Sequence, residues 1–282
     1  MTSYRQLVAR LPSQPSQDGD GVKIQRIAGP HFNQWLDPWL MLDEIRSDDA
    51  ANYIGGFPAH PHRGFETITL MMAGRMRHRD HLGNEGVIEP GDVQWMTAGR
   101  GVVHSEMPEQ SEGLLHGFQL WLNLPSKEKM KPAAYRDIRA NQVTQIEIGQ
   151  AAEIRLIAGK LKQDGQEYIG PIDGLSTQPL LADIHLNAGQ SLNLESSAAQ
   201  RLMLYPYDGS TTELESRTLG IYDQGDQLRI AASGEPARLL LIGGVPLREP
   251  IAQYGPFVMN TQDELMQAIQ DYQNGELTGS GA

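Results

Sequence analysis

Short apolar segments at close spacing dominate the first half of the chain. From Val22 onward they read VKIQRI, ETITLMMAG, GVIEPGDVQWM and GFQLWLNL, with glycine, proline or aspartate between them. ETITLMMAG predicts a mostly buried strand. QLWLNL alternates, so that Leu120, Leu122 and Leu124 share one face of a strand. This rhythm favours an antiparallel β-sandwich or barrel over a helical bundle.

The same rhythm returns in the second half, in AEIRLIAGKL, LLADIHLNAG, RLMLYPYDG, TLGIYDQGDQLRIAA and ARLLLIGGVPL. Between the halves, residues 125–140 are polar and charged and predict a linker. We therefore predict an all-β fold of two consecutive domains, residues 1–135 and residues 136–282. The turn-rich residues 12–21, PSQPSQDGDG, predict a loop or a hairpin tip.

One short helix is predicted near the end of the chain. Thr261 and Glu264 have the spacing of a capping box, which would start the helix. Gly275 would end it. Between these residues, apolar positions recur at helical spacing, namely Leu265, Ile269 and Tyr272. We expect this helix to pack against a domain and to carry no chemistry.

Composition narrows the range of partners and of metal ligands. The chain has 282 residues, a net charge of −12 and no cysteine. A chain with this net charge lacks the basic surface that direct binding to nucleic acid or to an anionic membrane requires, so we expect neither partner. Without cysteine, a metal would be held by His, Asp or Glu. The first residues contain no apolar signal core, so we expect a cytoplasmic protein.

The sequence contains two pairs of potential metal ligands, and within each pair a single residue separates the two ligands. His60 and His62 stand in PAHPHRGFET, and His104 and Glu106 stand in GRGVVHSEMP. Alternate residues of a strand point to the same face, so each pair can reach one point. For the first pair alone, two solvated loop histidines would be the alternative. Together, three imidazoles and a carboxylate favour an open, catalytic site for Fe or Mn.

Other polar residues near these pairs have competing interpretations. Glu66 is a rival carboxylate ligand, although Gly64 can interrupt the strand alternation before it. His78 and Asp80 could support the ligands or form a weaker metal pair, but the charged stretch MRHRDH favours a solvated hairpin. The remaining residues are expected to be structural: His31, His116, the strand residue His185, and most of Trp95, Met96 and Met107, of which one or two would line the pocket.

Four blocks of the sequence resemble the pirin family of the cupin superfamily: FNQWLDPWLMLDEI, HPHRGFETIT, GDVQWMTAGRGVVHSEMP and GFQLWLNLP. The segment YGPFVMNTQDEL is also similar to the C-terminal region of pirins. The resemblance implies a bicupin, with two β-sandwich or barrel domains. It also implies one iron ion per chain, bound in the N-terminal domain, and no metal in the C-terminal domain. Fe2+ is the expected ion, with other divalent transition metals as alternatives. By the resemblance its ligands are His60, His62, His104 and Glu106.

The resemblance further implies quercetin 2,3-dioxygenase activity on a small apolar flavonol with dioxygen. Glu106 would then be both a metal ligand and the base for the flavonol hydroxyl. A second interpretation is a non-enzymatic, iron-binding regulator that senses redox state or metal and acts through a protein partner. The two interpretations share the site and differ in what meets it. Turnover of quercetin by the iron-loaded protein would distinguish them.

Overall fold

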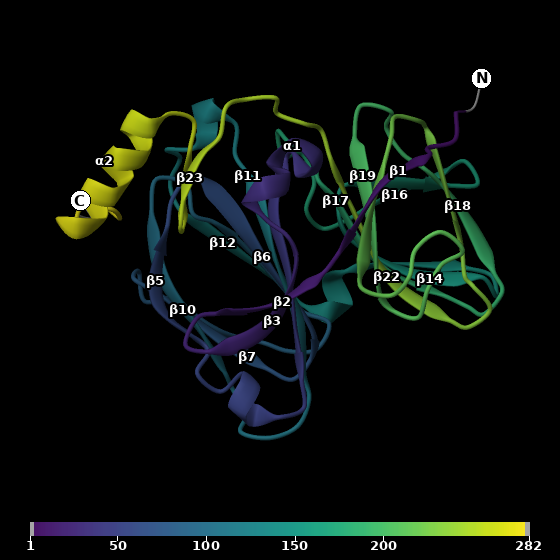
Figure 1. Ribbon diagram of the computed structural model, residues 1–282, viewed down its shortest axis with the longest axis horizontal. Coiled ribbons are helices and arrows are strands. Elements are labelled where there is room, and N and C mark those ends of the chain that lie inside the picture. Colours follow the sequence, from purple (N-terminus) through teal and green to yellow (C-terminus); the bar gives the residue numbers. More distant parts are fainter. Residues whose placement is uncertain (1–2, 280–282) are drawn as a thin grey trace. The chain divides into compact units, whose positions relative to one another are not determined.

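The computed structural model describes residues 3–279, which group into two compact units built mainly of antiparallel strands (Figure 1). Unit 1 comprises the segment through Ser13, Gln34–Asp37 and Asn141–Pro246. Unit 2 comprises Gln14–Asn33, Pro38–Ala140 and the segment from Leu247 onward. No helix within residues 3–279 is both long enough and apolar enough to cross a membrane. The predicted all-β fold is confirmed.

Each unit combines segments that lie far apart in the sequence. The N-terminal strand pairs within unit 1, and the segment after Pro246 belongs to unit 2. The compact units are thus discontinuous, whereas the predicted domains 1–135 and 136–282 are continuous. Those domain limits stay a prediction.

The described part of unit 2 contains three sheets. The seven-stranded sheet, in the order β12-β9-β6-β11-β4-β3-β2, consists of β2 (Gln14–Asp18), β3 (Val22–Ala28), β4 (Trp39–Ser47), β6 (Phe65–Ala73), β9 (Val93–Thr97), β11 (Leu115–Asn123) and β12 (Ala134–Ile138). The four-stranded sheet, in the order β5-β10-β7-β8, consists of β5 (Phe57–His62), β7 (Met76–Asp80), β8 (Glu85–Ile88) and β10 (Val102–Pro108). The third sheet consists of β23 (Ala252–Tyr254) and β24 (Phe257–Met259).

Unit 1 repeats the combination of a seven-stranded and a four-stranded sheet. The larger sheet, in the order β1-β20-β19-β22-β17-β14-β13, consists of β1 (Leu7–Pro12), β13 (Thr144–Ile148), β14 (Ala152–Ala158), β17 (Leu180–Leu186), β19 (Arg201–Asp208), β20 (Thr218–Tyr222) and β22 (Ala237–Gly244). The smaller sheet, in the order β16-β15-β18-β21, consists of β15 (Lys160–Gln163), β16 (Gln166–Ile169), β18 (Ser191–Glu195) and β21 (Gln227–Ala231). The helix α1 (Asn33–Leu36) is a single turn.

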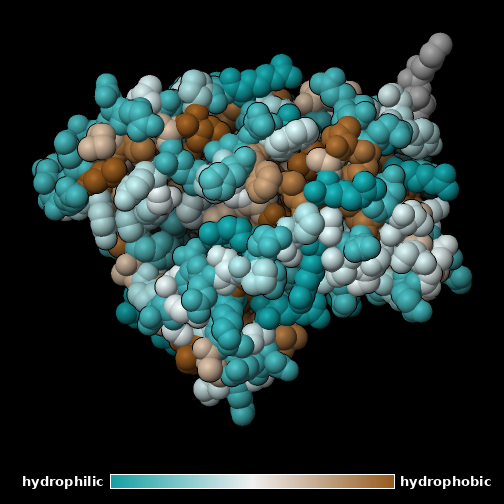
Figure 2. Space-filling model, in the orientation of Figure 1, coloured by the Kyte–Doolittle hydropathy of each residue, from teal (hydrophilic) through white to brown (hydrophobic). Residues whose placement is uncertain are grey.

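The alternation in QLWLNL correctly predicts which side chains enter the core. Leu120 and Leu122 on β11, and Leu124 just after it, are at most 3% exposed. The first seven residues of β6 are all buried, as expected for ETITLMMAG. Unit 1 has an extensive apolar core of its own. Outside such cores, hydrophilic residues cover much of the face drawn in Figure 2.

The C-terminal helix forms as predicted. Helix α2 (Gln262–Gln273) begins after Thr261, whose side chain accepts a hydrogen bond from the backbone N–H of Glu264. The Glu264 carboxylate accepts in return from the backbone N–H of Thr261, which completes the capping box. The chain leaves the helix at Gly275 with a φ of 75°, a left-handed conformation that glycine adopts without strain.

Residues 125–140 are part of unit 2, and the prediction of a linker is wrong. Their strand β12 pairs with β9 from Ala134 to Ile138. Lys129 is only 1% exposed. The fold tolerates this burial because the side-chain nitrogen donates to three oxygens. These are the carbonyl oxygens of Gly64 at 2.7 Å and Val258 at 2.9 Å, and Oδ1 of Asn123 at 2.6 Å. A buried lysine side chain with such partners holds three separate segments together.

The segment 12–21 forms one arm and the tip of a hairpin. β2 pairs with β3 up to Asp18 and Val22, and the turn contains Gly19 at a φ of 55° and Gly21 at a φ of 80°. The hairpin tip was predicted, whereas the strand before it was not. This hairpin places Asp18 beside the cavity described below.

Arg63, the residue after His62, ties the C-terminal segment to the end of β5. Its side chain is 4% exposed and forms an ion pair with Asp271 of α2 at 2.6 Å. It also donates to the carbonyl oxygens of Leu277, at 3.0 Å, and of Arg100. Its backbone carbonyl accepts a hydrogen bond from the N–H of Val258 at 3.0 Å. Unit 2 is therefore complete only with residues from both ends of its sequence.

Candidate metal centre

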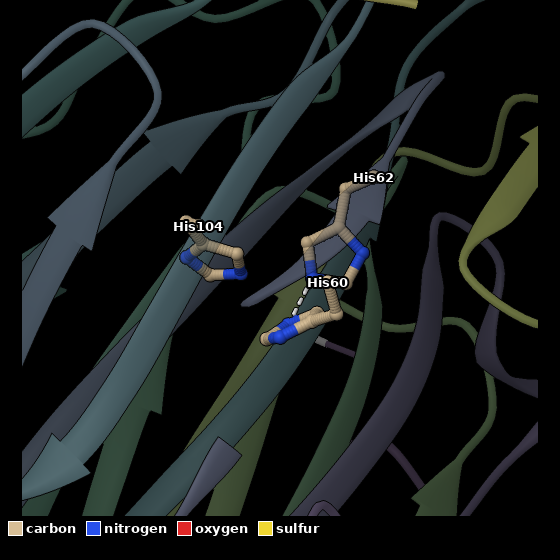
Figure 3. Close-up of side chains that lie close together, drawn as sticks. All are labelled: His60, His62 and His104. Carbon is tan, nitrogen blue, oxygen red and sulfur yellow. Dashed lines mark hydrogen bonds between the residues drawn. The ribbon is translucent and has the colours of Figure 1, made fainter. Parts of the chain in front are cut away.

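Three histidines converge on neighbouring strands of unit 2 (Figure 3). His60 and His62 lie on β5, and His104 lies on β10, directly across from His60. The ring centroids are 4.4 Å apart for His60 and His104, 4.7 Å for His60 and His62, and 4.8 Å for His62 and His104. Potential ligand nitrogens of all three lie within 4.8 Å of one another. The predicted strand alternation therefore brings the three imidazoles together.

The spacing of two of these nitrogens fits a bound transition metal. The Nε2 atoms of His60 and His62 are 3.0 Å apart. Two nitrogens that bind one ion at a right angle, each at a typical bond length, would be about 3 Å apart. Without a proton or a cation between them, their lone pairs would repel. Nε2 of His104 is also buried and has no hydrogen-bond partner among the described residues, which leaves it available to a metal.

Burial keeps two of these imidazoles neutral. It lowers the pKa of His62 and of His104 well below the usual value, and charge on the neighbouring histidines lowers both further. Neutral imidazole is the form that binds a metal. Nδ1 of His60 lies 2.8 Å from the carbonyl oxygen of Pro58. If Nδ1–H donates there, the lone pair of Nε2 faces His62 and His104.

His78 supports His104 from the next strand. The hairpin predicted for this stretch forms between β7 and β8, but alternate side chains of β7 are buried rather than solvated. On β7, Met76, His78 and Asp80 are buried, whereas Arg77 and Arg79 point outward. Nδ1 of His78 lies 3.3 Å from Nδ1 of His104. The carboxylate of Asp80 accepts from nearby N–H groups of the following turn instead.

Glu106 lies beside the histidines but is not part of their close cluster. It is 4% exposed, and it lines the same cavity as His60 and His62. Its Oε1 accepts a hydrogen bond from the hydroxyl of Thr69 at 2.9 Å. The Thr69 hydroxyl oxygen is also 2.9 Å from Oε1 of Gln119. The role of Glu106 as a ligand stays a prediction.

Glu66, the rival carboxylate, is buried and has partners of its own. Its Oε1 accepts from the Thr97 hydroxyl at 2.6 Å, and its Oε2 accepts from the Trp95 indole N–H at 3.1 Å. Lys131 lies 3.5 Å from Oε1. Gly64, at a φ of 91°, separates Glu66 from the two histidines of β5. These contacts hold Glu66 apart from the three imidazoles, so we retain Glu106 as the predicted ligand.

A cavity of about 670 Å³ opens beside the histidines. Its walls are largely apolar and include Ile24, Met41, Ile45, Phe57 and Trp121. The indole of Trp121 packs against the rings of Phe65 and His62, with centroids 4.4 and 5.3 Å away. Such a cavity suits a small apolar molecule.

Trp95 and Met96 belong to the core, as predicted for most of these residues, but the expectation that one or two of Trp95, Met96 and Met107 line the cavity is wrong. Trp95 and Met96 are buried at 3% and 1% exposure, and neither they nor Met107 line it. Gln119 and Trp121 do line it, on the face of β11 opposite the core leucines. The alternation in QLWLNL contained this signal, because a tryptophan opposite three leucines needs a second apolar surface.

His116 and His185 are not part of this cluster. His116 is buried, with Nε2 3.1 Å from a carboxylate oxygen of Glu44, as expected for a structural residue. His185 lies on β17 of unit 1, between Glu153 and Arg238 on the neighbouring strands. The absence of a bound metal from unit 1 stays a prediction.

The metal-free protein should lose stability in mild acid. The folded-state pKa values of His62 and His104 are depressed, so the unfolded chain binds more protons below its own pKa near 6.5. The stabilisation is therefore present above that pH and is lost as the pH falls. The raised pKa of Asp43 on β4 offsets part of this loss, and we expect the free energy of unfolding to fall by roughly 1 to 2 kcal/mol between pH 7 and pH 5.5, measured by urea denaturation.

Two variants test the origin of this loss. His104→Ala should remove a large part of the pH dependence, because one of the buried histidines with a depressed pKa is gone. His185→Ala should retain all of it. An equal pH dependence in His104→Ala and the unmodified protein would contradict the assignment.

Comparisons with known proteins agree with the fold and with the sequence blocks. The pirin family model matches residues 21–122, and the model of the pirin C-terminal cupin domain matches residues 181–278. A Pseudomonas aeruginosa protein described as a candidate quercetin 2,3-dioxygenase is 43% identical over 98% of this chain and 99% of its own length. Human pirin is 34% identical over 98% of this chain and 95% of its own length.

Solved structures show the same architecture. A structure described as quercetin 2,3-dioxygenase from Acinetobacter baumannii superposes with a TM-score of 0.90 at 32% identity, and covers 98% of this chain and 99% of that one. A bacterial pirin from Escherichia coli in complex with nickel(II) superposes with a TM-score of 0.61 at 20% identity, over 84% of this chain and 98% of that one. At that identity the second likeness concerns the fold alone.

Proposed function

The chain belongs to the pirin family of bicupins, and from this premise we propose that it is an iron-dependent dioxygenase that cleaves flavonols such as quercetin. The relatives described as quercetin 2,3-dioxygenases support the reaction class. A shared fold alone would not be sufficient, so the proposal also depends on the chemistry of the site.

The observation that carries the proposal is the convergence of three imidazoles beside an apolar cavity that His60 and His62 line. His60, His62 and His104 would hold the metal, with Glu106 as the fourth ligand. Three imidazoles with one carboxylate favour iron or manganese over zinc. A bound iron ion would supply Lewis acidity toward a flavonol hydroxyl and one-electron chemistry toward dioxygen.

The protein would contribute a base and a dry binding surface. Glu106 would accept the proton of the flavonol hydroxyl. The ring becomes electron-rich only after this proton has left. The Thr69 hydroxyl holds Oε1 of Glu106 and so fixes the orientation of the carboxylate. The apolar residues Phe57 and Trp121 would exclude water from the planar substrate.

Oxygen uptake tests this proposal. Chelator-treated protein is reloaded with Fe2+, and dioxygen and quercetin are followed together with an oxygen electrode and by absorbance. We expect quercetin to disappear with an equal amount of dioxygen, at a rate proportional to bound iron. Parallel samples contain free iron alone or the protein loaded with Zn2+, which has no redox chemistry.

The proposal fails if iron-replete protein consumes no dioxygen above the sample with free iron, for any flavonol in a small panel. The iron-binding regulator would then be the better interpretation of the same site. Its location in the cytoplasm and any protein partner remain predictions from the sequence.

A further inference from the structure

A row of polar side chains crosses the wall of the cavity from one strand to the next. Arg26 on β3 pairs in register with Asp43 on β4, and Asp43 pairs with Gln119 on β11. Gln119 pairs in turn with Thr69 on β6, the residue that binds Glu106. Asp43 and Thr69 are only 3% and 6% exposed. Polar groups in such a position need hydrogen-bond partners, which Arg26 supplies for Asp43, and Glu106 and Gln119 supply for Thr69.

Apolar residues flank this polar row on both sides. Two residues away along β4 lie Met41 in one direction and Ile45 in the other, and both line the cavity. Trp121, two residues from Gln119 on β11, pairs in register with Met41. A planar molecule on this wall would place its ring faces on apolar side chains and its polar edge on the row.

The lining of the cavity contains two polar groups, one near each end of this row. One end contains His60, His62 and Glu106. The other end contains Arg26 and Asp43, with Asp18 at the tip of the hairpin. Asp43 lies two strands from Thr69, which corresponds to about 10 Å across the sheet. We call the group of Arg26, Asp43 and Asp18 the remote end.

The remote end is built from one guanidinium and two carboxylates. Arg26 donates from Nε to Oδ1 of Asp43 at 3.0 Å and from Nη2 to Oδ2 at 2.7 Å. Nη2 also donates to Oδ2 of Asp18 at 3.0 Å. The side chains of Arg26 and Asp18 are 34% and 51% exposed and so are open to a ligand, whereas the buried Asp43 can be reached only from the cavity that it lines.

Its charge selects the kind of ligand. Two carboxylates and one guanidinium leave one net negative charge, which repels an anion such as a carboxylate or a phosphate. Burial outweighs the hydrogen bonds from Arg26 and raises the pKa of Asp43 to about 6, so this carboxylate is still mostly ionised at pH 7. Ionised oxygens accept strong hydrogen bonds from neutral hydroxyl groups.

We propose that the remote end is a specificity subsite, and that Asp43 and Asp18 accept hydrogen bonds from phenolic hydroxyls on the substrate ring farthest from the histidines. This inference rests on the proposed function, since it takes the metal-facing group to be the flavonol hydroxyl. It defines the substrate class as neutral, planar polyphenols with a hydroxyl group at each end.

Three flavonols that differ only in their pendant ring provide the test. Galangin has no hydroxyl on that ring, kaempferol has one and quercetin has two. Their dissociation constants are measured by calorimetry with iron-loaded protein in the absence of oxygen, so that binding is separated from turnover. We expect quercetin to bind at least about tenfold more tightly than galangin, as for a hydrogen bond to a charged acceptor.

Two variants then locate the preference. Asp43→Asn and Asp18→Asn should each reduce the ratio of quercetin to galangin affinity to about threefold or less, with galangin affinity nearly unchanged. Asp18→Asn is the safer variant for folding, because Asp18 is half exposed and Asp43 is a buried partner of Arg26. Asp20→Asn removes the same charge from the same hairpin outside the cavity lining and should keep the full ratio.

Equal binding of galangin and quercetin by the unmodified protein would overturn the proposal, and so would an unchanged ratio in both variants or no binding of any flavonol. Oxygen uptake under air is recorded separately for the same samples. If binding shows the expected preference but no oxygen is consumed, the dioxygenase function fails and the subsite stands. If oxygen is consumed without any preference, the subsite fails and the function stands.

Discussion

His104→Ala and His62→Ala should each lower the affinity for iron by more than about 100-fold and leave purified protein with little metal. Each substitution removes one of three imidazoles that converge within 4.8 Å. The fold should survive, because the apolar cores of both units lie elsewhere. Metal content is measured by elemental analysis, and folding by circular dichroism. The unmodified protein should bind about one iron ion per chain.

The control for this experiment is His185→Ala in unit 1. Asp183, two residues away, is already engaged by Arg155 and by the Tyr207 hydroxyl, so the loss of His185 should leave the metal content at about one ion per chain. Near-normal metal in His62→Ala or His104→Ala would refute the ligand assignment. About two ions per chain, reduced to one by His185→Ala, would reveal a second site in unit 1.

Glu106→Gln should reduce flavonol turnover by about 10²- to 10⁴-fold at equal iron loading, the usual range for loss of a general base. Glutamine keeps the shape of the side chain and can still accept from the Thr69 hydroxyl, so the geometry should persist. It cannot take up a proton. Turnover is compared at matched metal content, and iron affinity is measured separately by chelator competition.

Glu66→Gln is the matched control, since Glu66 is equally buried but bonded to Thr97 and Trp95. It should retain most of the turnover and most of the iron affinity, whereas Glu106→Gln should weaken iron binding more. The reverse order of affinities would identify Glu66 as the ligand. Full activity in Glu106→Gln would exclude Glu106 as the base.

Features set by neighbouring residues could be predicted from the sequence. The capping box at Thr261, the buried strand β6 and the leucine face of β11 all follow from spacing alone. The histidine cluster also follows, because two strands with the same alternation need only pair in register. Here His104 pairs directly with His60.

Features set by distant residues could not be predicted in this way. The stretch MRHRDH was interpreted from its charges, although strict alternation buries His78 and exposes Arg77 and Arg79. Residues 125–140 resemble a linker in composition, but Lys129 finds its acceptors in three distant segments. The contact between Arg26 and Asp43 depends on the register of β3 with β4, which neither strand specifies alone.

The ion pair between Arg63 and Asp271 also has a consequence for the order of events on the ribosome. Residues 60, 62 and 104 leave the ribosome long before residue 271, and translation at about 5 to 20 residues per second separates them by roughly ten to forty seconds. During this interval the end of β5 lacks the partners that Asp271, Val258 and Leu277 later provide. We therefore expect the three imidazoles of the nascent chain to be accessible to metal ions and chaperones before the surrounding residues have folded.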